Sequence, residues 1–303
     1  MQLRPLPRPV GRFFAMALVC SLSGFLQSCF LFQPSRRHKD ISYVAPDAPD
    51  FAGERHRLDV YVPRRQAAEP RPVVLFIHGG SWRSGNKNTY TFIGRRLAKK
   101  GRSSDAVVAV ILNYRLAPSV QVPAMADDCA RAVKWVLDSI SAYGGNPDKI
   151  YVMGHSAGGG LAALLATKAE LFRRQGVARN PVKGALLNDP GGLDMYDYLQ
   201  KMEYPGDESY LVPFGKDPAG WRDVSPLYFI DANDPPMLLF VGGRTYPSIA
   251  SSSRTFRDRL QAVGVPYQFT EMPRKKHIPM VTQLFWKNNR LYRDLHRLIS
   301  TGR

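Results

Sequence analysis

Short apolar runs alternate along the chain with segments in which apolar residues recur every three or four positions. Two of these runs, residues 72–80 and 105–115, have the continuous apolar core expected of strands buried on both faces of a parallel sheet, and residues 182–189 and 236–243 predict two further strands. Helical spacing covers residues 125–140, 160–172 and 248–264. Strands that alternate with helices predict an α/β fold, with helices on both faces of a mostly parallel sheet.

The remaining segments complete this prediction. Residues 58–63 alternate like an edge strand, residues 150–154 form a short buried strand, and residues 267–272 and 283–300 predict the last strand and the last helix. Residues 191–233 lack clear periodicity and are rich in Tyr, Pro, Asp and Gly. Because that segment is long for a plain connection, we interpret it as an insertion that caps a site.

The first residues have the pattern of a targeting segment. Arg4, Arg8 and Arg12 precede an apolar stretch, residues 13–26, that is short for a membrane span. The following "LQSC" resembles a bacterial lipobox and predicts a lipoprotein signal peptide over residues 1–28 and lipidation of Cys29. An ordinary signal peptide and an uncleaved membrane anchor remain alternatives.

The lipobox interpretation divides the chain. Residues 29–56 are polar and contain proline, which predicts a tether, and residues 57–303 then form the folded domain. The expected location is the bacterial cell envelope, on the periplasmic or outer-membrane side, with the lipid in the membrane. Of the three cysteines, only Cys129 would remain free after processing, so no intramolecular disulfide is expected.

Charge does not indicate a nucleic-acid partner. The formal net charge is +17, but the basic residues lie in short, scattered groups. There is no long basic helix, zinc-ligand pattern or RNA-binding aromatic signature. We therefore interpret the positive charge as a solvated surface that is compatible with anionic lipid headgroups.

A serine lies among glycines in "GHSAG", residues 154–158, where a predicted strand ends and a predicted helix begins. This is G-x-S-x-G in the context that a nucleophile elbow requires. The glycines leave room for a strained serine, and the amides at the start of the helix face a developing oxyanion. A plain turn would explain the glycines alone, and a phosphate loop would require a G-K-[ST] that is missing.

A second glycine-rich turn, "HGGSW", follows the buried strand that ends near His78. Acyl transfer requires backbone donors aimed at the carbonyl oxygen, and such a turn can present them. We predict an oxyanion hole formed by the amides of Gly80 and Ser81 on one side and of Ala157 on the other.

Together with "NYRLAP" (113–118) and "VSPL" (224–227), these motifs resemble the α/β-hydrolase superfamily, in particular hormone-sensitive-lipase-like esterases and kynurenine-formamidase-like and feruloyl-esterase-like enzymes. The similarity covers roughly residues 57–300. It implies the α/β-hydrolase fold and a Ser–acid–His triad in that chain order, with Ser156 as nucleophile. It also implies that the chemistry uses neither a metal nor an organic cofactor.

The histidine of the triad is assigned to His277. It follows the last predicted strand and begins "HIPM", where the resemblance places the base. His78 and His155 lie inside motifs and are interpreted as structural. Arg274, Lys275 and Lys276 directly precede His277; they are either solvated or attract anionic substrates.

The acid departs from the family pattern. The loop in which the resemblance places it, residues 241–249, contains no carboxylate, and Thr245 stands at the expected position. Asp189 ends the preceding strand and is our first candidate, with Asp194 second and Asp231 and Asp234 weaker. For each aspartate, a turn or helix-capping role is the alternative.

The sequence thus predicts a lipid-anchored serine hydrolase that acts on carboxylic esters or similarly activated acyl groups through an acyl-enzyme. Small polysaccharide-linked esters and arylformamides both fit the resemblance. The alternative is a binding protein with this fold and little or no catalytic activity, which the missing acid would favour. The oligomeric state cannot be predicted from the sequence.

Overall fold

The computed structural model describes residues 35–65, 67–99 and 106–302. The predicted signal peptide, Cys29 and the start of the predicted tether lie outside these ranges. Among the described residues, no helix combines the length and apolar character needed to cross a bilayer.

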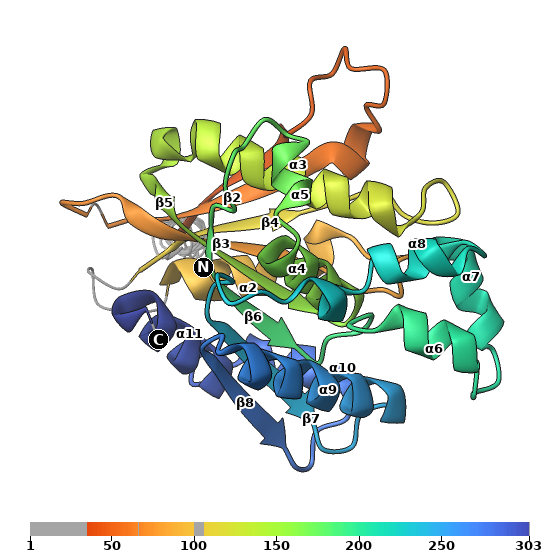
Figure 1. The fold of residues 1–303 in the computed structure, drawn as a ribbon. Helices are drawn as coiled ribbons and strands as arrows, with labels where there is room; N and C mark the ends of the chain where they lie inside the picture. Colours follow the sequence, from red (N-terminus) through yellow and green to blue (C-terminus); the bar gives the residue numbers. More distant parts are fainter. Residues whose placement is uncertain (1–34, 66, 100–105, 303) are drawn as a thin grey trace, which may run out of the picture. The chain divides into compact units, whose positions relative to one another are not determined.

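The described chain contains an eight-stranded sheet in the order β1-β2-β4-β3-β5-β6-β7-β8, and helices pack against this sheet (Figure 1). β1 and β2 pair antiparallel, as do β2 and β4, and the other pairs are parallel. The strands are β1 (Ser35–Ser42), β2 (Arg57–Pro63), β3 (Arg71–Ile77), β4 (Val108–Leu112), β5 (Gly145–His155), β6 (Val182–Asn188), β7 (Met237–Gly242) and β8 (Tyr267–Met272).

Helices cover both faces of the sheet, as the alternation in the sequence predicts. The α-helices are α2 (Thr91–Lys99), α3 (Val122–Ser139), α4 (Ala157–Thr167), α5 (Glu170–Arg173), α6 (Met195–Lys201), α7 (Leu211–Phe214), α8 (Pro218–Asp223), α9 (Pro247–Val263), α10 (His277–Thr282) and α11 (Arg290–Thr301). Short 3-10 helices are η1 (Gly53–His56), η2 (Lys87–Tyr90), η3 (Ile140–Tyr143), η4 (Asp207–Tyr210), η5 (Pro226–Phe229) and η6 (Gln283–Phe285).

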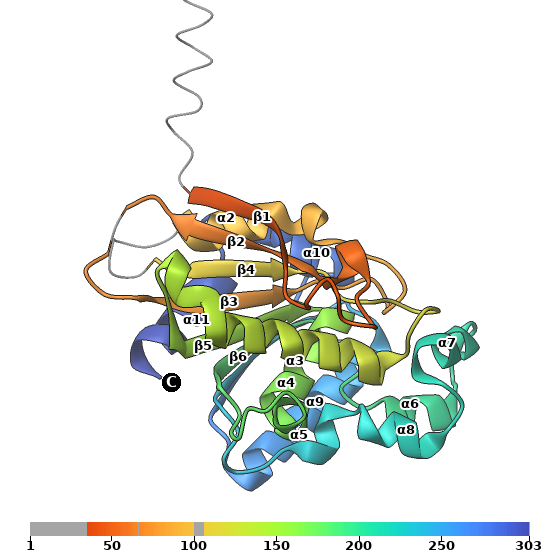
Figure 2. The same cartoon turned by 90° about the horizontal axis from the view of Figure 1, so that it is seen from above.

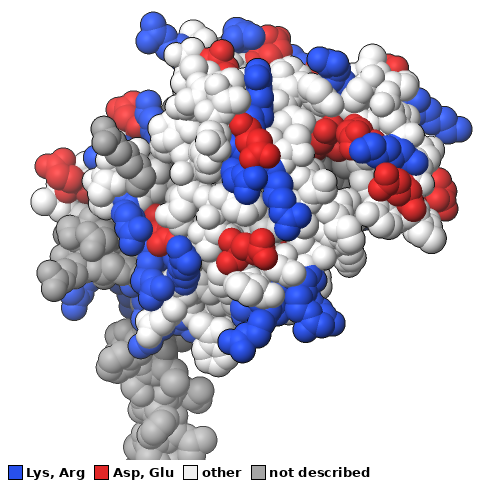
Figure 3. Space-filling view, turned by 60° about the horizontal axis from the view of Figure 1, so that its bottom comes forward, with Lys and Arg blue, Asp and Glu red and all other residues white. Residues whose placement is uncertain are grey.

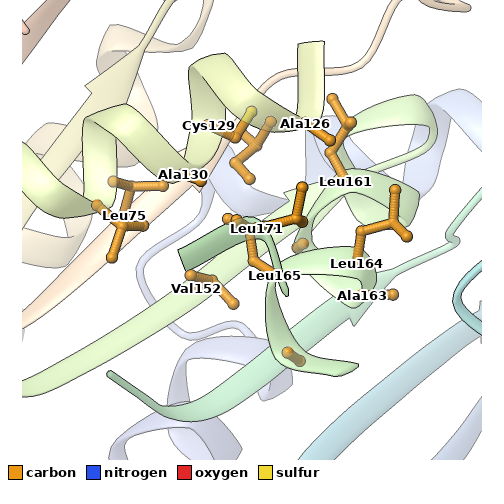
Figure 4. Close-up of a cluster of buried hydrophobic side chains, with 14 of the residues drawn as sticks. Leu75, Ala126, Cys129, Ala130, Val152, Leu161, Ala163, Leu164, Leu165 and Leu171 are labelled. Atoms are coloured by element: carbon orange, nitrogen blue, oxygen red, sulfur yellow. The ribbon is translucent and has the colours of Figure 1, made fainter. Parts of the chain in front are cut away.

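The core lies in two layers, one on each face of the sheet. On one face, side chains from α3, α4 and α9 pack against the strands; Figure 4 shows Cys129, Leu161 and Leu165 in this layer. On the other face, α2, α10 and α11 pack against the opposite side chains of the same strands. Both faces of the central strands are therefore buried, which explains their continuously apolar sequences. Figure 2 shows the sheet from above with α3 and α4 beside it.

The prediction of a tether through residue 56 is wrong for the described part of that segment. Residues 35–42 form β1, which pairs with β2 and makes β2 an inner strand rather than the predicted edge strand. A cluster of charged side chains links the two strands. Buried Lys87 bonds Asp40 of β1 and Asp59 of β2, and Arg37 donates to Asp59 at 2.8 Å.

Two predicted helices are shorter than their apolar patterns. The helix predicted over residues 283–300 divides into η6 and α11, and Asn289 caps α11 by accepting a hydrogen bond from the amide of Leu291. The helix predicted over residues 160–172 divides into α4 and α5. Residues 191–233 contain α6, α7 and α8, which project from one side of the sheet (Figure 1).

Positive and negative side chains are interspersed on the face that Figure 3 shows, and the Lys and Arg residues form no single continuous field there. This agrees with the scattered basic groups in the sequence.

Candidate active site

Ser156 occupies a sharp turn between β5 and α4. Its φ of 56° and ψ of −126° are strained for a residue with a side chain. The turn tolerates no side chain at Gly154 or Gly158: a Cβ would lie 2.0 Å from the Gly158 carbonyl oxygen in the first case and 2.2 Å from the Ile77 carbonyl oxygen in the second. The G-x-S-x-G spacing is therefore required by close backbone contacts that project the serine hydroxyl from the sheet.

His277 links Ser156 to Asp189. Its Nε2 lies 2.8 Å from Ser156 Oγ, and its Nδ1 lies 2.6 Å from Asp189 Oδ2. With the Nδ1 proton donated to the carboxylate, Nε2 is left to accept the proton of the serine hydroxyl. The three residues come from the ends of β5 and β6 and from the start of α10, so the carboxyl ends of the strands bring them together.

The Asp189 carboxylate is fully buried, and three donors surround it. Its Oδ1 accepts from the Gly242 amide at 2.8 Å, and its Oδ2 accepts from Thr245 Oγ1 at 2.5 Å and from His277. Asp189 has a φ of 51°, and its amide donates to the Phe240 carbonyl at 2.7 Å. A buried carboxylate requires such hydrogen-bond partners.

The other candidate acids have different partners. Asp194 caps α6, accepting hydrogen bonds from the Asp197 amide at 3.1 Å and from the Tyr228 hydroxyl at 3.2 Å, and burial raises its pKa. Asp231 and Asp234 form a local turn, in which burial raises the pKa of Asp234 to about 7. Within the part of the chain that the structure describes, Asp189 is the one of these four aspartates that forms a hydrogen bond with His277.

The "HGGSW" turn lies against the serine elbow. A Cβ at Gly79 would be 3.0 Å from the Cβ of Ser156, and Gly80 has a φ of 130°, which suits glycine. Ala157 is the first residue of α4, where an amide has no acceptor within its own helix. The structure thus brings the turn with Gly80 and Ser81 and the start of α4 to Ser156; their role as oxyanion donors stays a prediction.

His78 and His155 are buried beside these groups. Burial lowers the pKa of each to about 4. His155 Nε2 lies 3.2 Å from the backbone carbonyl of His277, and the His78 ring stacks on Tyr114. Both side chains hold backbone or neighbouring rings in place, which agrees with the structural role that their positions in the motifs indicate.

A cavity of about 760 Å³ opens at the serine. Ser156 and His277 lie in its wall, together with residues of the segment 191–233. The aromatic side chains of the wall are Trp82, Tyr90, Tyr198, Tyr204, Tyr210 and Tyr246. The aromatic wall was not predicted, because its members are spread over four separate segments. Among the described residues, no three His, Cys, Asp or Glu side chains are grouped as a metal site would require.

Comparisons with known proteins find relatives that are named esterases. The model of the BD-FAE family matches residues 58–260. The isoprenylcysteine alpha-carbonyl methylesterase of Arabidopsis thaliana is 31% identical over 88% of this chain, which spans 64% of that protein's length. Esterase LipQ of Mycobacterium tuberculosis is 27% identical over 84% of this chain, which spans 61% of its length.

Solved structures agree on the fold. A truncated carbohydrate esterase from gut microbiota superposes with a TM-score of 0.73 at 20% identity, covering 89% of this chain and 97% of its own. A hyperthermophilic esterase of Pyrobaculum calidifontis superposes with a TM-score of 0.67 at 24% identity, covering 95% of this chain and 92% of its own. These similarities establish the predicted α/β-hydrolase fold.

Proposed function

The chain belongs to the BD-FAE family, and from that premise we propose that it is a serine carboxylesterase that works through an acyl-enzyme. The observation that carries the proposal is the continuous chain of hydrogen bonds from Ser156 through His277 to Asp189. A binding protein would need no strained serine in contact with a histidine whose other nitrogen faces a buried carboxylate. The relatives named above as esterases support the same reaction class.

The mechanism follows from the geometry. Ser156 Oγ attacks the ester carbonyl carbon while its proton passes to His277 Nε2. The C=O electron pair becomes an oxyanion, which the amides of Gly80, Ser81 and Ala157 stabilise. When the oxyanion collapses, the C–O bond to the alcohol breaks and His277 returns its proton to the leaving oxygen. Asp189 accepts a hydrogen bond from His277 Nδ1 and stabilises the imidazolium that forms.

The second half repeats these steps with water. His277 takes a proton from a water molecule, whose oxygen attacks the acyl-enzyme. Collapse of that intermediate releases the carboxylic acid and returns the proton to Ser156. A formamide would follow the same steps with a C–N bond broken instead, so an arylformamidase is a second candidate function. The volume and the aromatic lining of the cavity suit either a ring or a sugar beside the reacting carbonyl.

A fluorophosphonate probe and a p-nitrophenyl ester test the proposal. The wild-type protein should be labelled at Ser156, and Ser156→Ala should lose labelling and lower kcat by about a millionfold, the scale of nucleophile removal in a comparable triad. Ser141→Ala, at an exposed serine of η3, is the matched control and should behave as wild type. Unchanged hydrolysis by Ser156→Ala would refute the assignment. A parallel assay with N-formyl-arylamines separates the two candidate functions.

We also propose that Cys29 carries lipid and that the domain is therefore attached to a membrane of the bacterial cell envelope. The basis is sequence alone: three arginines, an apolar stretch and "LQSC" in that order. A multiply acylated cysteine would give stable attachment, since a single acyl chain binds only marginally.

A further inference from the structure

We propose that Thr245 is a positioning residue of this site, which holds the Asp189 carboxylate in the orientation that His277 requires. The proposal rests on the proposed function, because it concerns the acid of the same triad. Thr245 Oγ1 donates to Asp189 Oδ2 at 2.5 Å, and the same oxygen accepts from His277 Nδ1 at 2.6 Å. One carboxylate oxygen therefore has both partners.

The turn that contains Thr245 is fixed on both sides. Its amide donates to the Gly242 carbonyl at 3.1 Å, while the Gly242 amide donates to the other Asp189 oxygen at 2.8 Å. The turn thus supplies two donors to one carboxylate, one to each oxygen. Such a pair leaves the carboxylate plane little freedom to rotate about its own bond.

The same turn also contacts the segment that leads to His277. The amides of Gly243 and Arg244 donate to the carbonyls of Met272 and Lys275 at 2.9 and 3.0 Å. A Cβ at Gly242 would lie 2.6 Å from the Lys275 carbonyl oxygen, so the backbones meet without room for a side chain. The turn is therefore a common support for the acid and for the start of α10.

These contacts assign a role to the residue at the position where the resembled families have their acid. In this chain the carboxylate is that of Asp189, directly after β6, and the turn after β7 supplies two neutral hydrogen-bond donors to it. Thr245 does not touch the reacting atoms, so its effect on turnover passes through Asp189. If Thr245 acts in this way, the effect of its substitution on kcat should depend on the presence of Asp189. A residue that only fills space would show no such dependence.

Steady-state kinetics on a p-nitrophenyl ester test the proposal. Thr245→Val keeps the shape and removes the hydroxyl, and it should lower kcat about tenfold or more while KM changes less than about twofold. Thr245→Ser, which keeps the donor, should restore most of the lost kcat. Thr282→Val makes the same chemical change at an exposed threonine of α10 and should match the wild type.

A double-mutant cycle decides whether Thr245 acts through the acid. In an Asp189→Asn background, Thr245→Val should reduce kcat by less than about twofold, because the carboxylate that Thr245 orients is already lost. A full tenfold loss in that background, or wild-type kcat in Thr245→Val alone, overturns the proposal. If Ser156→Ala remains active, the proposed function itself fails; if Ser156→Ala is inactive and Thr245→Val is normal, only the role of Thr245 fails.

Discussion

Replacing Asp189 by asparagine changes one atom of the buried carboxylate and tests the acid directly. In the wild type, the carboxylate accepts from the Gly242 amide, the Thr245 hydroxyl and His277 Nδ1. An asparagine oxygen can still accept from Gly242, but its NH₂ group then faces Thr245 and His277. The threonine hydroxyl can rotate to accept, whereas a protonated Nδ1 cannot.

The imidazole must therefore change tautomer. With Nδ1 accepting from the asparagine NH₂, the ring proton moves to Nε2, 2.8 Å from Ser156 Oγ, where the proton of the serine has to be received. The nucleophile loses its base, and the imidazolium loses its counter-charge. We expect kcat to fall about ten-thousandfold, as in another triad with the same substitution, which corresponds to about 5 kcal/mol of transition-state stabilisation.

The assay compares Asp189→Asn with Asp194→Asn by p-nitrophenyl ester hydrolysis, with circular dichroism and thermal unfolding as folding controls. Asp189→Asn should fold and bind substrate with a KM close to that of the wild type. Asp194→Asn should keep kcat within a few-fold and change the stability by less than about 1 kcal/mol, because an asparagine oxygen can cap α6 as aspartate does. The reasoning is refuted if Asp189→Asn turns over normally while Asp194→Asn does not.

Two further predictions concern stability and location. His78 and His155 have pKa values lowered by burial from 6.5 to about 4, so the unfolded chain binds protons that the folded protein excludes. The free energy of unfolding should therefore fall as the pH drops from 6.5 toward 4, by roughly 3 kcal/mol for each histidine. Urea unfolding at several pH values measures it, and an equally steep loss in His155→Gln would contradict it. Cys29→Ala should move the protein from the membrane fraction to the soluble fraction or leave it as a precursor, and a wild-type protein found wholly in the soluble fraction would exclude the anchor.

The sheet was predictable because its strands are buried on both faces. Residues 73–77 and 108–112 are apolar at every position, and no amphipathic helix has that pattern. The elbow at Ser156 was predictable because close backbone contacts leave no room for a side chain at Gly154 or Gly158. The turn therefore requires a glycine two residues before and two residues after the serine, and that spacing is visible in the sequence.

β1 could not be predicted from its own residues. Ser35 to Ser42 reads SRRHKDIS, with one strongly apolar residue, and lacks the alternation of a strand. Its pairing depends on partners distant in the sequence, since Lys87 and Asp59 complete the charge cluster with Asp40. The break before α11 had a local signal, the capping Asn289, but the apolar pattern continues through η6 and conceals it.

The place of the acid follows from the geometry of adjacent strands. β6 and β7 are neighbours in parallel register, with Asn188 opposite Phe240, so their carboxyl ends lie one strand spacing apart, about 4.8 Å. A carboxylate from either end can therefore reach a histidine at the start of α10, provided that the other end supplies donors in place of a competing charge. Here β6 has the carboxylate and the turn after β7 supplies the Gly242 amide and the Thr245 hydroxyl. A search for an acid in the turn after β7 alone would classify this chain as incomplete. The triad is defined by where the side chains converge, and Asp189 and Thr245 together satisfy that requirement from two strands.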